Sequence, residues 1–170
     1  MPDPSSQAES RNVIESIVRS IPGFKGYFER EDRRESDRLA RTWIVDQLQK
    51  CKSVLNDWQQ SLVDSGQLDL LTPCERFRSR LDLLQSRVKG AMRGYSGFFD
   101  FVKINEAELD QVYQADLVLM GDVTGLLETS EQLLAAGAKA QDILTKLAQQ
   151  LDELNRGFDK RNERLEGMNK

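Results

Sequence analysis

The sequence predicts an all-α protein: an elongated, antiparallel four-helix bundle of coiled-coil type, preceded by a short N-terminal helix. The 170-residue chain contains only four prolines, and long segments lack both proline and glycine. Within those segments the apolar residues recur alternately four and three positions apart, which is the spacing of a helix face buried against other helices. We expect one domain over residues 10–170, with helices at about 10–20, 29–65, 73–93, 105–136 and 139–166.

The longest predicted helix covers about residues 29–65. It contains no proline or glycine between Glu29 and Asp64, and Ser65-Gly66 is a usual C-terminal stop. Its apolar face follows the four-three spacing, so we expect the other helices to cover it. The residues of this face are Ile44, Leu48, Cys51, Leu55, Trp58 and Leu62.

Two short pieces precede the long helix. Residues 1–9 are polar and rich in proline and serine, which favours a disordered N-terminal tip. Residues 10–20 place four apolar side chains on one helical face. This short helix should end at Pro22-Gly23, because the residue before a proline leaves helical space and glycine permits a turn.

The helix predicted at 73–93 leads into an aromatic connector. Thr72-Pro73 is typical of an N-cap followed by a first-turn proline. The connector at 94–104 is too apolar for a free loop, so we expect it to cap the bundle end, with a ligand or partner pocket as the alternative. The buried face of the helix is expected to be Phe77, Leu81, Leu84, Val88 and Ala91.

The helix predicted at 105–136 contains two glycines among good helix formers. Gly121 and Gly125 each cost up to about 1 kcal/mol relative to alanine. Close approach of Trp43 or Trp58 would explain them, and a kink is the other explanation. The inward residues are expected to be Leu109, Tyr113, Leu117, Met120, Val123, Leu127 and Leu134.

The last predicted helix, at 139–166, follows a turn at Gly137 and has the most regular apolar face. Its repeat reaches a charged residue at Arg161, which suggests that the end of the helix frays or leaves the core. The inward residues are expected to be Ala140, Leu144, Leu147, Leu151, Leu154, Phe158 and Leu165.

Charge is distributed unequally between two of these helices. The 73–93 helix carries six basic residues and two acids, whereas the 105–136 helix carries seven acids and no lysine or arginine. Because a short connector joins them, we expect the two helices to lie side by side and antiparallel, with the basic stripe facing the acidic helix and not a phosphate. Asp116, flanked by apolar turns, would then need a cationic partner such as Arg80 or Arg41.

The strongest candidate for a binding surface lies where the long helix begins. Residues 21–28, IPGFKGYF, set three aromatic side chains around two glycines, and the following EREDRRESDR mixes acids and arginines at helical spacing. The simpler interpretation is structural: an aromatic cap on the bundle end and a solvated helix start. In the alternative, a partner docks on Phe24, Tyr27, Phe28, Arg30, Arg33 and Arg34.

The stretch IPGFKGYFEREDRRESDRLAR also resembles an N-terminal signature of an uncharacterised family of bacterial helical proteins. The resemblance covers about 20 residues and rests on IPGFKGY and the charged run that follows it. It implies a bacterial, intracellular origin, and it assigns no catalytic, cofactor or metal-binding residue.

Composition weakens the case for an enzyme. Histidine is absent, which removes the commonest general base and a frequent metal ligand, including the one that ferritin-like bundles need. No Walker-type phosphate loop, dinucleotide fingerprint or CxxC pair occurs. Cys51 lies on a buried face, whereas Cys74 lies in the first turn of a helix, where the dipole lowers a thiol pKa. We expect no catalytic, cofactor or metal site, with a reactive Cys74 as the alternative.

These observations favour a non-enzymatic scaffold or adaptor that binds an unknown protein partner. Two alternatives stay open: a peripheral membrane-surface binder that uses the amphipathic segment 13–28, and a thiol-based sensor or enzyme that uses Cys74. The apolar faces of the first and last long helices could also join a second copy into a homodimer. A net charge of −4 disfavours nucleic acid. Neither a signal peptide nor an apolar span of about 18 residues is visible, so we expect a cytoplasmic protein.

Overall fold

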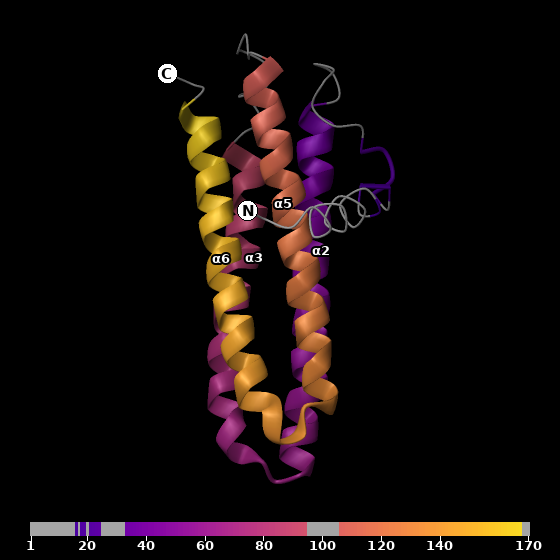
Figure 1. The fold of residues 1–170 in the computed structure, drawn as a ribbon, viewed down its shortest axis with the longest axis vertical. Coiled ribbons are helices and arrows are strands. Elements are labelled where there is room, and N and C mark those ends of the chain that lie inside the picture. The colour runs from indigo at the N-terminus through magenta and orange to yellow at the C-terminus, as the bar shows by residue number, and fades with distance from the viewer. Residues whose placement is uncertain (1–15, 17, 20, 25–32, 95–105, 168–170) are drawn as a thin grey trace, which may run out of the picture.

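The computed structural model describes residues 16, 18–19, 21–24, 33–94 and 106–167. Over these ranges the chain is an all-α bundle of four packed helices, as predicted (Figure 1). The long helices are α2 (Arg33–Asp64), α3 (Leu71–Gly94), α5 (Glu106–Glu131) and α6 (Ala140–Gly167). Short 3-10 turns occupy Leu68–Leu70, Gln132–Ala135 and Gly137–Lys139.

The N-terminal part of the chain is described at a few positions. Ser16, Val18 and Arg19 are helical, in agreement with the short helix expected at 10–20. The tip at 1–9 and residues 95–104 of the aromatic connector lie outside the described residues, so their predicted roles stay predictions.

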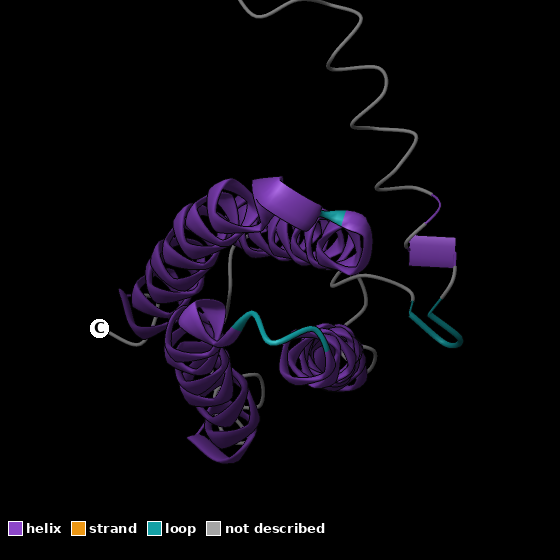
Figure 2. Ribbon diagram, turned by 90° about the horizontal axis from the view of Figure 1, so that it is seen from below, coloured by secondary structure: helices purple, strands orange, loops and turns teal. Residues whose placement is uncertain are grey.

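The order of the helices around the bundle differs from their order in the chain. Helices α2 and α6 each pack against both α3 and α5, so α3 and α5 occupy opposite corners. Figure 2 looks along the bundle from its lower end. Consecutive helices run antiparallel, but Arg80 and Arg87 of α3 pair with Asp152 and Asp159 of α6 in the same order, which makes these neighbours parallel. The predicted side-by-side pairing of α3 with α5 is therefore wrong.

The basic side chains of α3 find their acids mainly on α6. Arg87 bridges to Asp159, donates a hydrogen bond to Asn155 at 2.8 Å, and places its guanidinium 5.7 Å from the ring centre of Phe158. Such half-exposed pairs contribute about 0–1 kcal/mol each, too little to choose the neighbour of a helix. The net charge of a whole helix misled the prediction, because the apolar faces decide which helices meet.

The predicted apolar faces of α2, α3 and α6 form the core, whereas that of α5 was predicted only in part. All six residues of the α2 face are at most 4% exposed, and the predicted faces of α3 and α6 are buried along most of their length. Removing this apolar area from water contributes about 25 cal/mol per Å² and is the main force holding the bundle. One boundary prediction was wrong: α3 begins at Leu71, so Thr72 lies inside the helix and is not its N-cap.

The end of α5 also differs from the prediction. The α-helix stops at Glu131, and the chain continues in a 3-10 turn over Gln132–Ala135. Because a 3-10 helix has about 3.0 residues per turn in place of 3.6, the inward position moves along the chain. Leu133 is 1% exposed, whereas Leu134, predicted to face inward, is 56% exposed.

Neither tryptophan explains the glycines of α5. A Cβ atom added at Gly121 would meet nothing within 4 Å, and one added at Gly125 would meet only Nε2 of Gln150, at 3.8 Å. The close approach of α5 to α6 occurs instead at Gly157 of α6. A Cβ there would lie 3.0 Å from Cδ2 of Leu119, so this glycine lets the two helices meet.

Candidate functional site

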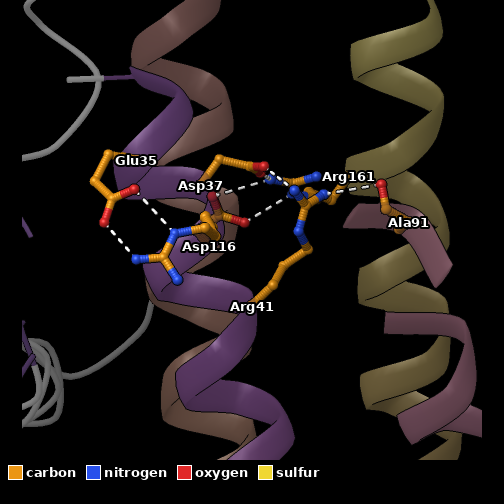
Figure 3. A network of polar contacts seen from close by, with 7 residues as sticks. Glu35, Asp37, Arg41, Ala91, Asp116 and Arg161 are labelled. Atoms are coloured by element: carbon orange, nitrogen blue, oxygen red, sulfur yellow. Dashed lines mark hydrogen bonds and ion pairs between the residues drawn. The ribbon is translucent and has the colours of Figure 1, made fainter. Parts of the chain in front are cut away.

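A cluster of four buried charges lies inside the bundle, at the level where α2 begins and α6 ends (Figure 3). Asp37 and Arg41 project from α2, Asp116 from α5 and Arg161 from α6. Their exposed fractions are 2%, 4%, 2% and 1%, respectively. Charges this deeply buried are costly unless they are paired and hydrogen-bonded, so the contacts among them decide whether the cluster stabilises the fold.

Arg161 is the centre of the cluster. Its Nε donates to Oδ1 of Asp116 at 2.8 Å, and its Nη2 donates to Oδ1 of Asp37 and, at 3.4 Å, to Oδ2 of Asp116. Arg41 donates through Nη2 to the other oxygen of Asp37 and through Nη1 to the Ala91 carbonyl of α3, at 3.3 Å. The cluster therefore connects all four long helices.

The cluster contains two carboxylates and two guanidinium groups, so its formal charge is zero. Burial raises the pKa of Asp37, and the neighbouring carboxylate of Asp116 adds to this rise, while Arg161 and Arg41 oppose it. Every contact above joins residues at one level of the bundle. We infer that the cluster fixes the axial register of helices whose leucine faces would tolerate a shift by one repeat.

The sequence located part of this cluster and misjudged the rest. The expectation that Asp116 is buried was correct, but its partner is Arg161, whereas Arg80 bridges to Asp152 on the surface. The sequence had suggested that the helix frays or leaves the core at Arg161. This prediction was wrong, because Arg161 is buried. Asp37 was missed, although it lies seven residues before Ile44 and so continues the buried face of α2 by one repeat.

The predicted partner-binding residues separate into two groups. Phe24 is 9% exposed and stacks on Tyr113 of α5, with ring centres 6.0 Å apart and planes 17° from parallel. It follows a turn in which Gly23 has a φ of +82°, and its N–H donates to the Ile21 carbonyl at 3.2 Å. Phe24 is therefore packed against α5, and its predicted role as a docking residue stays a prediction.

Only two of the remaining predicted residues, Arg33 and Arg34, belong to a described helix. Arg33 and Arg34 form the start of α2, but their side chains are not among the described ones. Tyr27, Phe28 and Arg30 lie outside the described residues. Their predicted role in binding a partner stays a prediction.

Both cysteines are fully buried, and the pKa expected for Cys74 was wrong in direction. Desolvation and, to a smaller extent, the neighbouring charge of Glu75 together raise the pKa of Cys74 from 9.0 to about 11. The pKa of Cys51 is raised to about 11 for the same first reason. Burial outweighs any effect of the helix dipole at Cys74, so neither thiol has the lowered pKa of a reactive cysteine.

We expect both cysteines to resist labelling by a disulfide reagent at neutral pH. A pKa raised by two units lowers the thiolate fraction about 100-fold, so the folded protein should react at least that much more slowly than a free cysteine peptide. The rate at which the reagent releases its coloured thiol, measured without denaturant and with it, checks this, and the unfolded protein in denaturant is the control. A reaction of folded Cys74 as fast as that of the peptide would contradict the buried position.

The residues that the structure describes contain no metal-binding group and no membrane-spanning helix. No three metal-ligating side chains among them form a group that could hold an ion. No described helix is both long and apolar enough to cross a membrane. Comparison with known proteins adds no relative, since no family model, curated protein or solved structure matches this chain.

Proposed function

We propose that this chain is a non-enzymatic helical scaffold or adaptor that acts in the cytoplasm by binding another protein. The observation that supports this most is the buried charge cluster, which ties α2, α3, α5 and α6 together at one level. A rod with a fixed register presents its outer faces at constant spacing, which is what a partner-binding surface requires. The buried positions of both cysteines remove the support for a thiol-based function.

The surface that we assign to the partner is the start of α2. Phe24 is occupied by its contact with Tyr113, so the charged residues next to it are the better candidates. Arg33 and Arg34 occupy the first turn of α2, and the preceding segment adds Arg30. Five acids are interspersed with the four arginines of residues 29–38, so a partner with an acidic surface would be recognised through individual ion pairs with these arginines and not through a net positive charge.

Affinity capture with matched variants tests this proposal. The full-length chain is used as bait in an extract of its native cells, beside Arg33→Glu/Arg34→Glu and the control Arg76→Glu/Lys89→Glu. The control makes the same charge change at two exposed residues of α3. We expect proteins that the wild type and the control retain and the α2 variant loses, with unchanged circular dichroism. Capture of the same proteins by all three baits would contradict the assigned surface.

The membrane-surface alternative has less support. Val18, Ile21 and Phe24, the described apolar residues of segment 13–28, pack against the hydrophobic core of the bundle. They would have to leave that core before entering a lipid interface. Flotation with anionic liposomes, with and without residues 1–28, separates the two functions, and flotation that depends on this segment would favour the membrane.

A further inference from the structure

The outer face shared by α5 and α6 has a hollow that the bundle does not fill (Figure 1 shows the two helices side by side). The cavity measures about 240 Å³, and Ala115, Val118, Leu119 and Gly157 are among its lining residues. Val118 is 56% exposed, unlike its neighbour Leu119 at 2%. An apolar side chain is therefore left in water beside a space that could hold another one.

Two basic side chains flank one end of this hollow along the helices, and two acidic side chains flank the other end. Lys160 and Arg164 of α6 line one end of it, and they lie three and seven residues beyond Gly157, or roughly 5 and 10 Å. Toward the other end lie Glu153 of α6 and Asp122 of α5, each four residues from the centre, or roughly 6 Å. The face is thus basic on one side of its apolar centre and acidic on the other.

These four charges lack ion-pair partners in the part of the chain that the structure describes. The neighbouring face is different, since Arg80 and Asp152 pair there across α3 and α6. Burial and the adjacent charge of Glu153 raise the pKa of Asp122, which means that the two acids repel each other without a cation to relieve them. Among the described residues, no lysine or arginine forms an ion pair with this acidic half.

The backbone of α5 next to this face is open to close approach. A side chain at Gly121 would meet no atom within 4 Å, so nothing inside the chain requires a glycine there. Glycine in a helix costs up to about 1 kcal/mol relative to alanine. A second helix passing over the outer face would use the space that this glycine leaves free.

We propose that a second copy of this chain docks on the α5–α6 face, related to the first by a two-fold axis near Val118 and Gly157. A two-fold axis perpendicular to the helices reverses their direction, so the basic half of each copy meets the acidic half of the other. Lys160 then lies opposite Glu153 of the second copy, since the two are roughly 5 and 6 Å from the axis, while Arg164, roughly 10 Å from the axis, extends the basic half beyond them. Each Val118 enters the hollow of the opposite copy.

This homodimer differs from one formed through the apolar faces of α2 and α6. The residues of those faces, such as Leu48 and Leu151, are fully buried within one chain and are not available to a second copy. The dimer is also independent of the proposed function, because the residues assigned to the protein partner lie at the start of α2. Failure of one proposal leaves the other intact.

Charge exchange on the full-length chain tests the dimer. Lys160→Glu/Arg164→Glu makes the face acidic throughout, and Asp122→Lys/Glu153→Lys makes it basic throughout. We expect the wild type to sediment as a dimer at about 0.1 mM, corresponding to a micromolar dissociation constant, and each double variant alone to dissociate at least tenfold more readily. An equimolar mixture of the two variants should recover the dimer, because each face then meets its complement.

A single substitution at the apolar centre supplies the matched control. Val118→Asp should abolish the dimer, whereas Leu83→Asp, at a residue of α3 that is 63% exposed, should not change it. Unchanged circular dichroism spectra show that every variant is folded. A wild type that stays monomeric at 0.1 mM would overturn the proposal. Double variants that each dimerise as well as the wild type, or a mixture that does not recover, would also overturn it.

Discussion

Replacement of Arg161 by methionine is expected to lower the free energy of unfolding by about 3–5 kcal/mol. The substitution keeps an apolar stem of similar length but removes the hydrogen bonds from Arg161 to Asp37 and Asp116. Both carboxylates stay buried near each other, and Asp37 keeps its hydrogen bond from Arg41. A buried carboxylate that loses its arginine bears more of the cost of desolvation. Total stabilities of single domains are about 5–15 kcal/mol, so urea denaturation followed by circular dichroism will resolve this loss.

A surface pair provides the control for this loss. Arg80→Met removes the same side chain from the bridge to Asp152, where the two side chains are 36% and 54% exposed. Half-exposed pairs contribute about 0–1 kcal/mol, so this variant should remain close to the wild type. If Arg161→Met lost no more stability than Arg80→Met, the cluster would not hold the helices together.

The pH dependence of the Arg161→Met variant gives the sign of the effect. Burial raises the pKa of Asp37 even while Arg161 opposes the shift, and without that arginine it should rise further. A carboxyl group with a folded-state pKa above its unfolded value, about 3.9, binds a proton more strongly when folded. Its stabilising contribution is therefore gained as pH falls through the folded-state pKa and lost as pH rises. The deficit of the variant should shrink from pH 7 toward about pH 4.5, and a growing deficit would contradict the buried carboxylate.

The four-three spacing was sufficient to predict the core faces of α2, α3 and α6, whereas on α5 it missed the buried Val112, Leu119 and Leu126. Burial of Leu48, Leu55, Leu81 and Leu147 follows from the period of the helix alone, because residues on one face of a helix meet the same neighbour. The choice of neighbour does not follow from that period. Any apolar face fits any other to a first approximation, so the sequence could not show that α3 meets α6 and lies opposite α5.

The charge cluster was predictable at the level of single helices. Asp37 and Arg161 both stand where the repeat calls for an apolar residue, which marks them as buried charges in need of partners. To pair them, the order of helices around the bundle must be known, since α2 and α6 lie at opposite corners and meet through this long arginine. The outer faces of α5 and α6 carried even less signal, because exposed residues follow no period.

The second large effect is expected where the helical period itself changes. Leu133→Ala should cost about 2–5 kcal/mol, because this residue is 1% exposed and its removal leaves a cavity. Leu134→Ala should change stability by less than about 0.5 kcal/mol, since that side chain is 56% exposed.

The two leucines are adjacent and identical in type, so propensity and composition cancel in the comparison, which urea denaturation measures directly. A continuous α-helix to residue 136, as the sequence suggested, would place Leu134 inside and reverse the ranking. Equal losses would mean that the turn is less ordered than the 3-10 geometry at Gln132–Ala135 requires. The pair therefore reports whether the chain tightens from 3.6 to about 3.0 residues per turn before it enters α6.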